Sequence, residues 1–321
     1  MAFYDIFNGD ADGICALHQL RLSEPRDSHL VTGTKRDIRL VARCPAADGD
    51  EMTVLDVSFD ANRDAVAAAL AAGARIRYFD HHFAGDILVH PRLETHIDTA
   101  ADVCTSLLVD RALQGRHRPW AVVAAFGDNL EQSALRAAAA LDYTPDAVDR
   151  LRELGESINY NAYGDSVDDL NYHPADLYRA LSRYADPFDF IAGEPVFDVL
   201  RQALADDLYR AAETRTQAVS ERSALIVLPD QPWSRRVSGI LGNRLAREHP
   251  QRAHAVLTAH RGGFQVSVRA PIARPQGADR LCRQFETGGG RAGAAGINHL
   301  PQADFERFAR AFAEAFEAPS P

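Results

Sequence analysis

Several features are scarce or missing in this 321-residue sequence, and each absence excludes a class of protein. The four cysteines are scattered and form no Cys-x-x-Cys pair, so we expect neither a disulfide framework nor a structural zinc site. No apolar run approaches the roughly 18 residues that a membrane span needs. No apolar leader follows the N-terminus either. We therefore expect a cytoplasmic protein without membrane association.

Positive charge is also scarce. The net charge is −10 at pH 7, with 35 Lys and Arg against 45 Asp and Glu. A surface for duplex nucleic acid needs clustered Lys and Arg, so we expect no stable duplex binding. A small anionic substrate, held by a few arginines and a metal ion, stays compatible with this charge. Lys35 is the single lysine, and codon usage is the simplest explanation for that bias toward arginine.

The length allows two domains with substantial cores, and the composition, 46% hydrophobic and 25% charged, is that of a globular protein. Apolar runs that predict strands alternate with helical patterns in the N-terminal part. The strands are expected at 2–7, 30–33, 52–57 and 75–79, with 95–99 a strand or a turn, and the helices at 14–22, 61–72 and 102–113. This alternation predicts an α/β fold with a mostly parallel sheet and flanking helices.

The remaining sequence predicts a helical region and then a second α/β unit. Residues 130–222 are expected to be mostly helical, with one long helix at 196–220 and a polar stretch at 154–165. That stretch is either a connection exposed to a cleft or a plain loop. Strands are expected at 224–228, 253–259 and 264–269, and helices at 239–249, 279–286 and 305–316. The predicted parts are a catalytic domain (1–190), a connecting helix (191–222) and a smaller domain with a mixed sheet (223–321).

Carboxylates and imidazoles end several of the predicted strands and apolar segments: Asp10, Asp12, Asp56, Asp80, His81, His82 and Asp128. Simpler roles are also possible: Asp10 and Asp12 suit the N-cap of a helix, and Asp128 suits a cap at the surface. Open α/β sheets, however, place their chemistry at the carboxyl ends of strands. Oxygen ligands with one or two imidazoles suit Mn²⁺ or Mg²⁺. Taken together, the set predicts a metal site at one edge of the sheet.

In this order, Asp10-Ala11-Asp12-Gly13, Asp56, Asp80-His81-His82 and Gly127-Asp128 resemble the motifs of the DHH phosphoesterase superfamily. Near the C-terminus, Gly288-Gly289-Gly290 with Arg291 resembles the glycine motif of the DHH-associated domain. Ser238-Gly239-Ile240 and Ser267-Val268-Arg269 also fit that domain. The resemblance covers nearly the whole chain. It implies a two-domain phosphoesterase that uses Mn²⁺ and binds its substrate between the domains.

The resemblance implies a role for each matching residue. The metal ligands would be Asp10, Asp12, Asp56, His81 and Asp128. Asp56 would bridge two divalent cations, Mn²⁺ in preference to Mg²⁺. The catalytic residues would be His82, at the scissile phosphate, and Asp80, which orients the histidine pair. The substrate-binding residues would be Arg269, Gly288, Gly289, Gly290 and Arg291.

Two positions depart from the family pattern. Many members have a histidine after the three glycines, where this chain has Arg291, which favours a terminal phosphate through paired hydrogen bonds. Asn8 stands where RecJ-type members have a further Asp, so we expect an altered affinity for the first metal. The sequence around Asn159 faintly resembles the RecJ linker region. Asn8 and Asn159 are therefore additional candidates for the site.

Three functions remain open on the sequence. The favoured one is a phosphodiesterase that hydrolyses short oligonucleotides, linear or cyclic dinucleotides, or 3′,5′-bisphosphate nucleosides to mononucleotides. The net charge of −10, and the lack of an added nucleic-acid-binding domain within the sequence, favour such small substrates. The alternative is a RecJ-like single-strand exonuclease, which needs a basic groove with stacking aromatics. The third is a non-hydrolytic nucleotide-binding regulator. A homodimer is compatible with all three.

Overall fold

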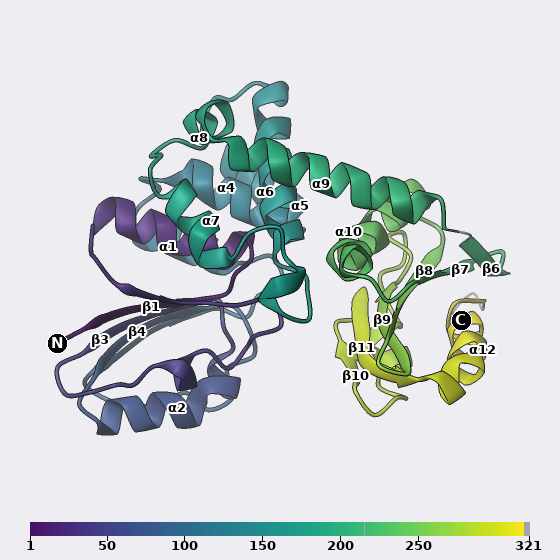
Figure 1. The fold of residues 1–321 in the computed structure, drawn as a ribbon, viewed down its shortest axis with the longest axis horizontal. Coiled ribbons are helices and arrows are strands. Elements are labelled where there is room, and N and C mark those ends of the chain that lie inside the picture. The colour runs from purple at the N-terminus through teal and green to yellow at the C-terminus, as the bar shows by residue number, and fades with distance from the viewer. Residues whose placement is uncertain (215, 318–321) are drawn as a thin grey trace. The chain divides into compact units, whose positions relative to one another are not determined.

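The computed structural model describes residues 1–214 and 216–317, and the chain divides into two compact units, Met1–Ala203 and Leu204–Pro321 (Figure 1). The first unit contains a sheet in the order β2-β1-β3-β4-β5, in which all neighbouring strands run parallel. The strands are β1 (Phe3–Phe7), β2 (His29–Val31), β3 (Glu51–Leu55), β4 (Arg75–Asp80) and β5 (Leu93–Ile97). The predicted mostly parallel sheet is confirmed.

Alternating side chains on the central strands build a hydrophobic core on each face of this sheet. Phe7 and Phe79 face one core, whereas their neighbours Ile6 and Tyr78 face the other. In Figure 1, α2 (Phe59–Ala71) covers the second face. The first face is covered by α1 (Ala11–Ser23), α3 (Thr105–Ala112), α4 (Arg118–Gly127), α5 (Glu131–Ala138), α6 (Pro145–Asn161), α7 (Pro174–Leu181) and α8 (Pro187–Gly193).

Two predicted features of this unit differ from the structure. The helix expected at 102–113 begins only at Thr105. The polar stretch 154–165, predicted to be a connection or a loop, lies largely within α6 and is buried from Leu154 to Asn161 except for Glu156. The reason is that Leu151, Leu154 and Ile158 recur at helical spacing and fill the core.

The second unit contains a mixed sheet in the order β10-β11-β9-β8-β7-β6, with β7 and β8 parallel and the other pairs antiparallel. Its strands are β6 (Thr216–Ser220), β7 (Ser223–Leu228), β8 (Ala253–His260), β9 (Gly263–Arg269), β10 (Gly288–Gly290) and β11 (Ala294–Pro301). Its helices are α10 (Pro232–Glu248), α11 (Ala278–Cys282) and α12 (Phe305–Glu317). The predicted smaller α/β domain with a mixed sheet is confirmed.

The long helix expected at 196–220 is shorter in the structure. Helix α9 covers Pro195–Ala212, and Thr216–Ser220 forms β6. Antiparallel pairing with β7 prevails there over the local helical tendency of the sequence. Among the residues that the structure describes, no helix combines the length and the apolar character that a membrane span requires.

Helices α4 and α6 cross at two glycines, and this crossing shapes the site. A Cβ atom on Gly155 would lie 2.1 Å from the carbonyl oxygen of Val123 and 2.9 Å from the backbone nitrogen of Gly127. Only glycine allows the two backbones to approach so closely. Asp128 follows α4 directly and Asn159 lies one turn beyond Gly155 on α6, so the crossing sets the positions of both.

Replacing Gly155 with alanine is expected to destabilise the protein by about 1–3 kcal/mol, because the added methyl group forces the helices apart. Alanine normally stabilises a helix relative to glycine, so a loss of stability in Gly155→Ala would indicate that the two backbones are in close contact. The matched control is Gly242→Ala on α10, where the new Cβ would meet its nearest atom, Arg269 Cγ, at an ordinary 3.5 Å. Urea unfolding that ranks Gly155→Ala at or above the wild type would contradict the crossing.

Candidate metal centre

The carboxyl ends of β1, β3 and β4 bring predicted ligands together at one edge of the parallel sheet. Nε2 of His81 lies 3.4 Å from Oδ1 of Asp56, 3.9 Å from Oδ2 of Asp12 and 3.9 Å from Oδ2 of Asp128. His81, Asp56 and Asp12 are almost fully buried. Asp128 comes from the end of α4 rather than from a strand. Four of the five predicted ligands thus surround a single point.

The hydrogen bonding of His81 leaves its inner nitrogen available to a cation. Nδ1 lies 2.9 Å from the carbonyl oxygen of Val103, which can only accept, so Nδ1 carries the proton. In the neutral ring, Nε2 then points its lone pair at the surrounding carboxylates. A metal-binding histidine is held in this way by a partner for its other nitrogen.

The backbone N–H groups at the N-termini of two helices bind carboxylates of this cluster. Oδ2 and Oδ1 of Asp12 accept hydrogen bonds of 2.7 Å from the backbone N–H groups of Thr105 and Ser106, at the start of α3. Oδ1 of Asp10 accepts hydrogen bonds of 3.0 Å from the backbone N–H groups of Asp12 and Gly13, so Asp10 does cap α1. The capping role leaves Oδ2 of Asp10 facing the cluster.

Asp56 occupies the centre of the cluster in a strained conformation. Its φ of 59° lies in the left-handed region, which costs a non-glycine residue of the order of 1–3 kcal/mol. Burial and the charges of Asp12, Asp10 and Asp128 raise the pKa of Asp56 well above its ordinary value. The carboxylates of the cluster repel one another, and a divalent cation among them would remove that repulsion.

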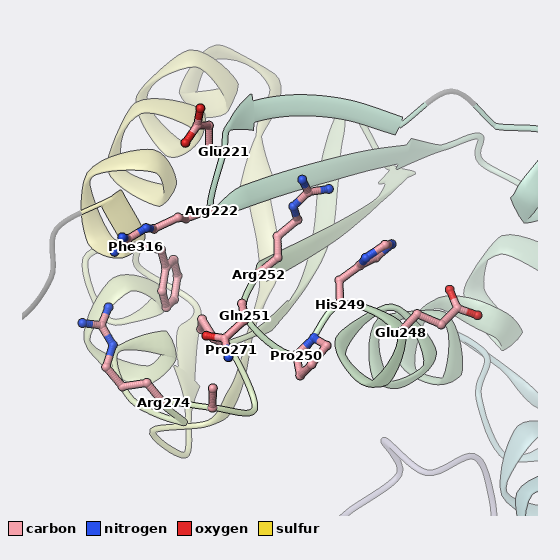
Figure 2. Close-up of a pocket in the computed structure, with 11 residues that line it drawn as sticks. Glu221, Arg222, Glu248, His249, Pro250, Gln251, Arg252, Pro271, Arg274 and Phe316 are labelled. Atoms are coloured by element: carbon pink, nitrogen blue, oxygen red, sulfur yellow. The ribbon is translucent and has the colours of Figure 1, made fainter.

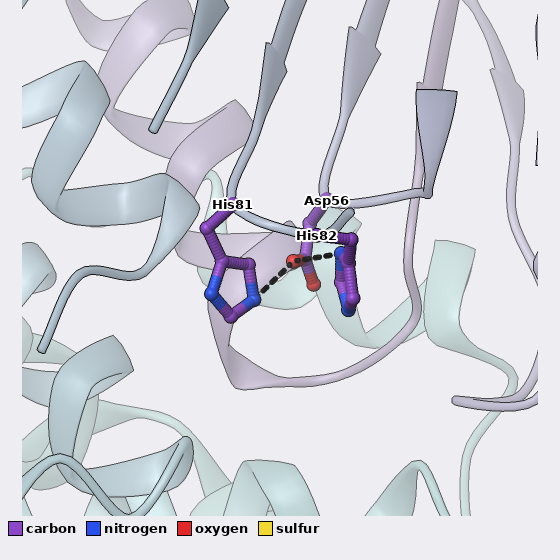
Figure 3. A group of neighbouring side chains, drawn as sticks. All are labelled: Asp56, His81 and His82. Atoms are coloured by element: carbon purple, nitrogen blue, oxygen red, sulfur yellow. Dashed lines mark ion pairs between the residues drawn. The ribbon is translucent and has the colours of Figure 1, made fainter. Parts of the chain in front are cut away.

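Asp80 holds His82 beside this cluster. Figure 3 shows His82 and His81 on either side of Asp56. Nδ1 of His82 donates to Oδ1 of the buried Asp80 at 2.7 Å, and lies 3.9 Å from Oδ1 of Asp56. Burial lowers the pKa of His82, but the hydrogen bond and charge of Asp80 outweigh it, so the pKa lies above its ordinary value. Although Asp56, His81 and His82 offer ligand atoms within 4.8 Å of one another, the bond to Asp80 occupies Nδ1 of His82. His82 is placed to contact an anion.

Lys35 was not predicted to belong to the site, yet its ammonium lies inside it. Nζ donates to Oδ2 of Asp10 at 2.5 Å, to Oδ1 of Asp128 at 3.3 Å and to Oδ1 of Asn159 at 3.2 Å. Burial opposes its charge, but the carboxylates of Asp10 and Asp128 prevail and raise the pKa of Lys35 well above its ordinary value. The signal in the sequence was that this is the single lysine, which codon usage seemed to explain.

The two candidate asparagines differ in their placement. Asn159 is buried on α6 and joins the cluster through Lys35. Asn8 uses its side chain locally: Oδ1 accepts from the backbone N–H of Asp10 at 3.2 Å, and Nδ2 donates to the carbonyl oxygen of Lys35 at 3.3 Å. Asn8 therefore positions the loop that carries Lys35.

The predicted substrate-binding residues lie in the second unit, on or directly after β9 and β10, and β11 separates these two strands in the sheet. Arg269 on β9 is held by Oδ1 of Asn243 at 2.6 Å and by Oγ of Ser267 at 3.0 Å. The residues Gly288, Gly289 and Gly290 form β10, which is an edge strand of the sheet. Arg291 follows them and is exposed. The outer backbone of β10 therefore has no strand partner among the described residues.

A separate cavity of about 710 Å³ lies in the second unit, with Arg222, Arg252, Arg274 and Phe316 among its lining residues (Figure 2). None of the predicted substrate-binding residues lines it. The cavity thus gives no support to the predicted contacts of Arg269 and the glycine strand.

No protein-family model and no curated protein matches this sequence. Solved structures do match. Exonuclease RecJ bound to manganese is 18% identical, with a TM-score of 0.62 over 99% of this chain and 91% of that one. The pGpG-specific phosphodiesterase PggH from Vibrio cholerae is 14% identical, with a TM-score of 0.57 over the whole of both chains. RecJ from Thermus thermophilus in complex with Mn²⁺ is 18% identical with a TM-score of 0.57, but this chain spans only 53% of it.

This chain shares its fold with exonuclease RecJ and with the phosphodiesterase PggH. The fold predicted from the motif resemblance is therefore confirmed over the length of the chain. At identities of 14–18%, the likeness establishes the fold alone, and the roles of individual residues depend on the geometry described above.

Replacing Asp80 with asparagine is expected to lower the pKa of His82, because the neighbouring carboxylate is what raises it. Asparagine can still accept the hydrogen bond from the backbone N–H of Phe59. Proton NMR titration of the metal-free protein measures the change. The internal control is His117, whose pKa burial already lowers and which should titrate identically in both proteins. An unchanged His82 titration would show that Asp80 does not hold its charge.

Proposed function

We propose that this chain is a divalent-cation-dependent phosphoesterase. The observation that carries the proposal is the surrounding of His81 Nε2 by Asp12, Asp56 and Asp128 at 3.4–3.9 Å. One imidazole nitrogen and the buried oxygens make a donor set that suits Mn²⁺ or Mg²⁺. The raised pKa of Asp56, caused by burial and the neighbouring carboxylates, is a further sign that a cation is needed there.

Different groups of the site would then act on the phosphate of the substrate. A divalent cation, when bound, would polarise a phosphoryl oxygen and favour attack by water. His82, whose pKa the neighbouring Asp80 raises, would donate a hydrogen bond to the scissile phosphate and stabilise its developing negative charge. The ammonium of Lys35 adds a positive charge on the other side of Asp128. In the second unit, the exposed Arg291 would bind a terminal phosphate.

The proposed substrates are short: oligonucleotides of a few residues, linear or cyclic dinucleotides, or 3′,5′-bisphosphate nucleosides. The net charge of −10 supports this choice, because a long strand needs a continuous basic groove. The fold is shared both with a pGpG-specific phosphodiesterase and with exonuclease RecJ, so the exonuclease is the second candidate. A non-hydrolytic regulator is the third, and four clustered carboxylates argue against it.

Replacing Asp56 with asparagine is expected to reduce hydrolysis by more than the roughly 10–100-fold that loss of an outer partner of a metal ligand costs. Asparagine tolerates the left-handed backbone that this position requires, so the fold should survive. The matched control is Asp60→Asn, which makes the same change on the half-exposed start of α2. Equal turnover by Asp56→Asn and the wild type would refute the proposed centre.

Purified protein with Mn²⁺ is expected to release mononucleotides rapidly from pGpG, a cyclic dinucleotide or adenosine 3′,5′-bisphosphate, and to digest a long 5′-labelled single strand poorly. Chromatography of the products over time measures both. Processive digestion of the long strand, with a steep dependence on salt, would establish the exonuclease instead. Binding without turnover of any substrate would favour the regulator.

A further inference from the structure

The ammonium of Lys35 is a cation already built into the proposed metal centre. Its Nζ contacts two of the proposed ligands, Oδ2 of Asp10 at 2.5 Å and Oδ1 of Asp128 at 3.3 Å, and the amide oxygen of Asn159 at 3.2 Å. Its side chain is only 26% exposed. An ammonium with three oxygen acceptors has filled its hydrogen-bonding capacity.

The backbone of Lys35 is held on both sides of the residue. The N–H group of Lys35 donates to the carbonyl oxygen of Ala162, at the end of α6, at 2.9 Å. Its own carbonyl oxygen accepts from Nδ2 of Asn8 at 3.3 Å. These bonds place the main chain of Lys35 beside the cluster, and the side chain reaches Asp10 and Asp128 from there.

The carboxylate oxygens are divided between two positions. Asp128 directs Oδ1 to Lys35 and Oδ2 toward His81, so it bridges the ammonium and the His81 position. Asp10 uses Oδ1 to cap α1 and Oδ2 to bind Lys35. Within the described part of the chain, no ammonium is bonded to the three oxygens that face His81, which are Oδ2 of Asp12, Oδ1 of Asp56 and Oδ2 of Asp128. The His81 position would thus accept an external cation, whereas the other position holds the ammonium.

Asn8 supplies no carboxylate at the position of the ammonium, where Asp10 and Asp128 are the acidic groups. Both polar atoms of the Asn8 side chain bind the backbone of Asp10 and Lys35. A second divalent ion at Asp10 would therefore have to displace the ammonium, or sit beside a like charge with few ligands.

We propose that this chain binds one divalent cation, at Asp12, Asp56, His81 and Asp128, and that the ammonium of Lys35 takes the place of a second. The inference rests on the proposed phosphoesterase function and narrows it. The phosphate of the substrate would then meet one metal ion and one fixed ammonium. The two-ion centre expected from the resemblance is replaced by a mixed one.

The test is the number of Mn²⁺ ions that the metal-free protein binds, which needs no substrate and no turnover. Calorimetric titration with Mn²⁺ alone is expected to give one ion per chain. Electron paramagnetic resonance of the loaded protein should show the hyperfine pattern of an isolated ion. Two ions per chain with the spectrum of a coupled pair would overturn the inference, while leaving the phosphoesterase proposal intact. The absence of Mn²⁺ binding would overturn both.

The variant Lys35→Ala is expected to bind two Mn²⁺ ions as a coupled pair, because Asp10 and Asp128 are then free to accept one. The matched control is Arg36→Ala, which removes a neighbouring but exposed positive charge and should keep one ion. Circular dichroism checks that both variants fold. One ion in folded Lys35→Ala, or two in Arg36→Ala, would contradict the role of the ammonium. If Lys35→Ala does not fold, the wild-type stoichiometry still decides.

Discussion

Repulsion among buried carboxylates is the constraint on which the first unit depends. Asp10, Asp12 and Asp56 are at most 2% exposed, and Asp128 lies against them. Carboxylates so crowded take up protons or separate unless positive charge is brought in. The chain supplies part of that charge through the N-termini of α1 and α3 and through Lys35. The negative charge that remains is what the proposed divalent cation would neutralise, so folding and metal binding would both depend on balancing the same charges.

The close packing of α4 and α6 helps to position this cluster. Gly127 and Gly155 let α4 and α6 approach until their backbones touch, and the residues just beyond the crossing are Asp128 and Asn159. The left-handed backbone of Asp56 turns its carboxylate into the same space. Local strain at Asp56 and the large conformational entropy that glycine loses on folding both lower stability. Their occurrence around one group of charges indicates that the geometry of the cluster is what the packing preserves.

Features that depend on neighbouring residues could be predicted from the sequence, whereas contacts between distant segments could not. The strands that precede Asp56 and His81 are short apolar runs that end in polar side chains, so the sheet edge could be anticipated. Asn159 seemed to lie in a loop because its stretch is polar, although its apolar neighbours have helical spacing. Lys35 could not be placed, because its partners lie 25, 93 and 124 residues away and no pattern links them. The only signal in the sequence was that Lys35 is the single lysine.

The pairing of arginines with acidic residues bears on how this acidic protein would bind an anion. Many arginines pair with acidic neighbours on the same helix, as in Arg150–Glu153, Arg179–Asp176 and Arg201–Asp198. Such pairs give no continuous positive surface, and the field of a −10 chain repels polyanions at a distance. Attraction would then be confined to the few ångströms around Lys35, His82 and the proposed cation, because salt screens charges beyond roughly 8–10 Å. Each further phosphate of a long strand would add repulsion without a matching contact, and this is the physical reason for proposing substrates with few phosphates.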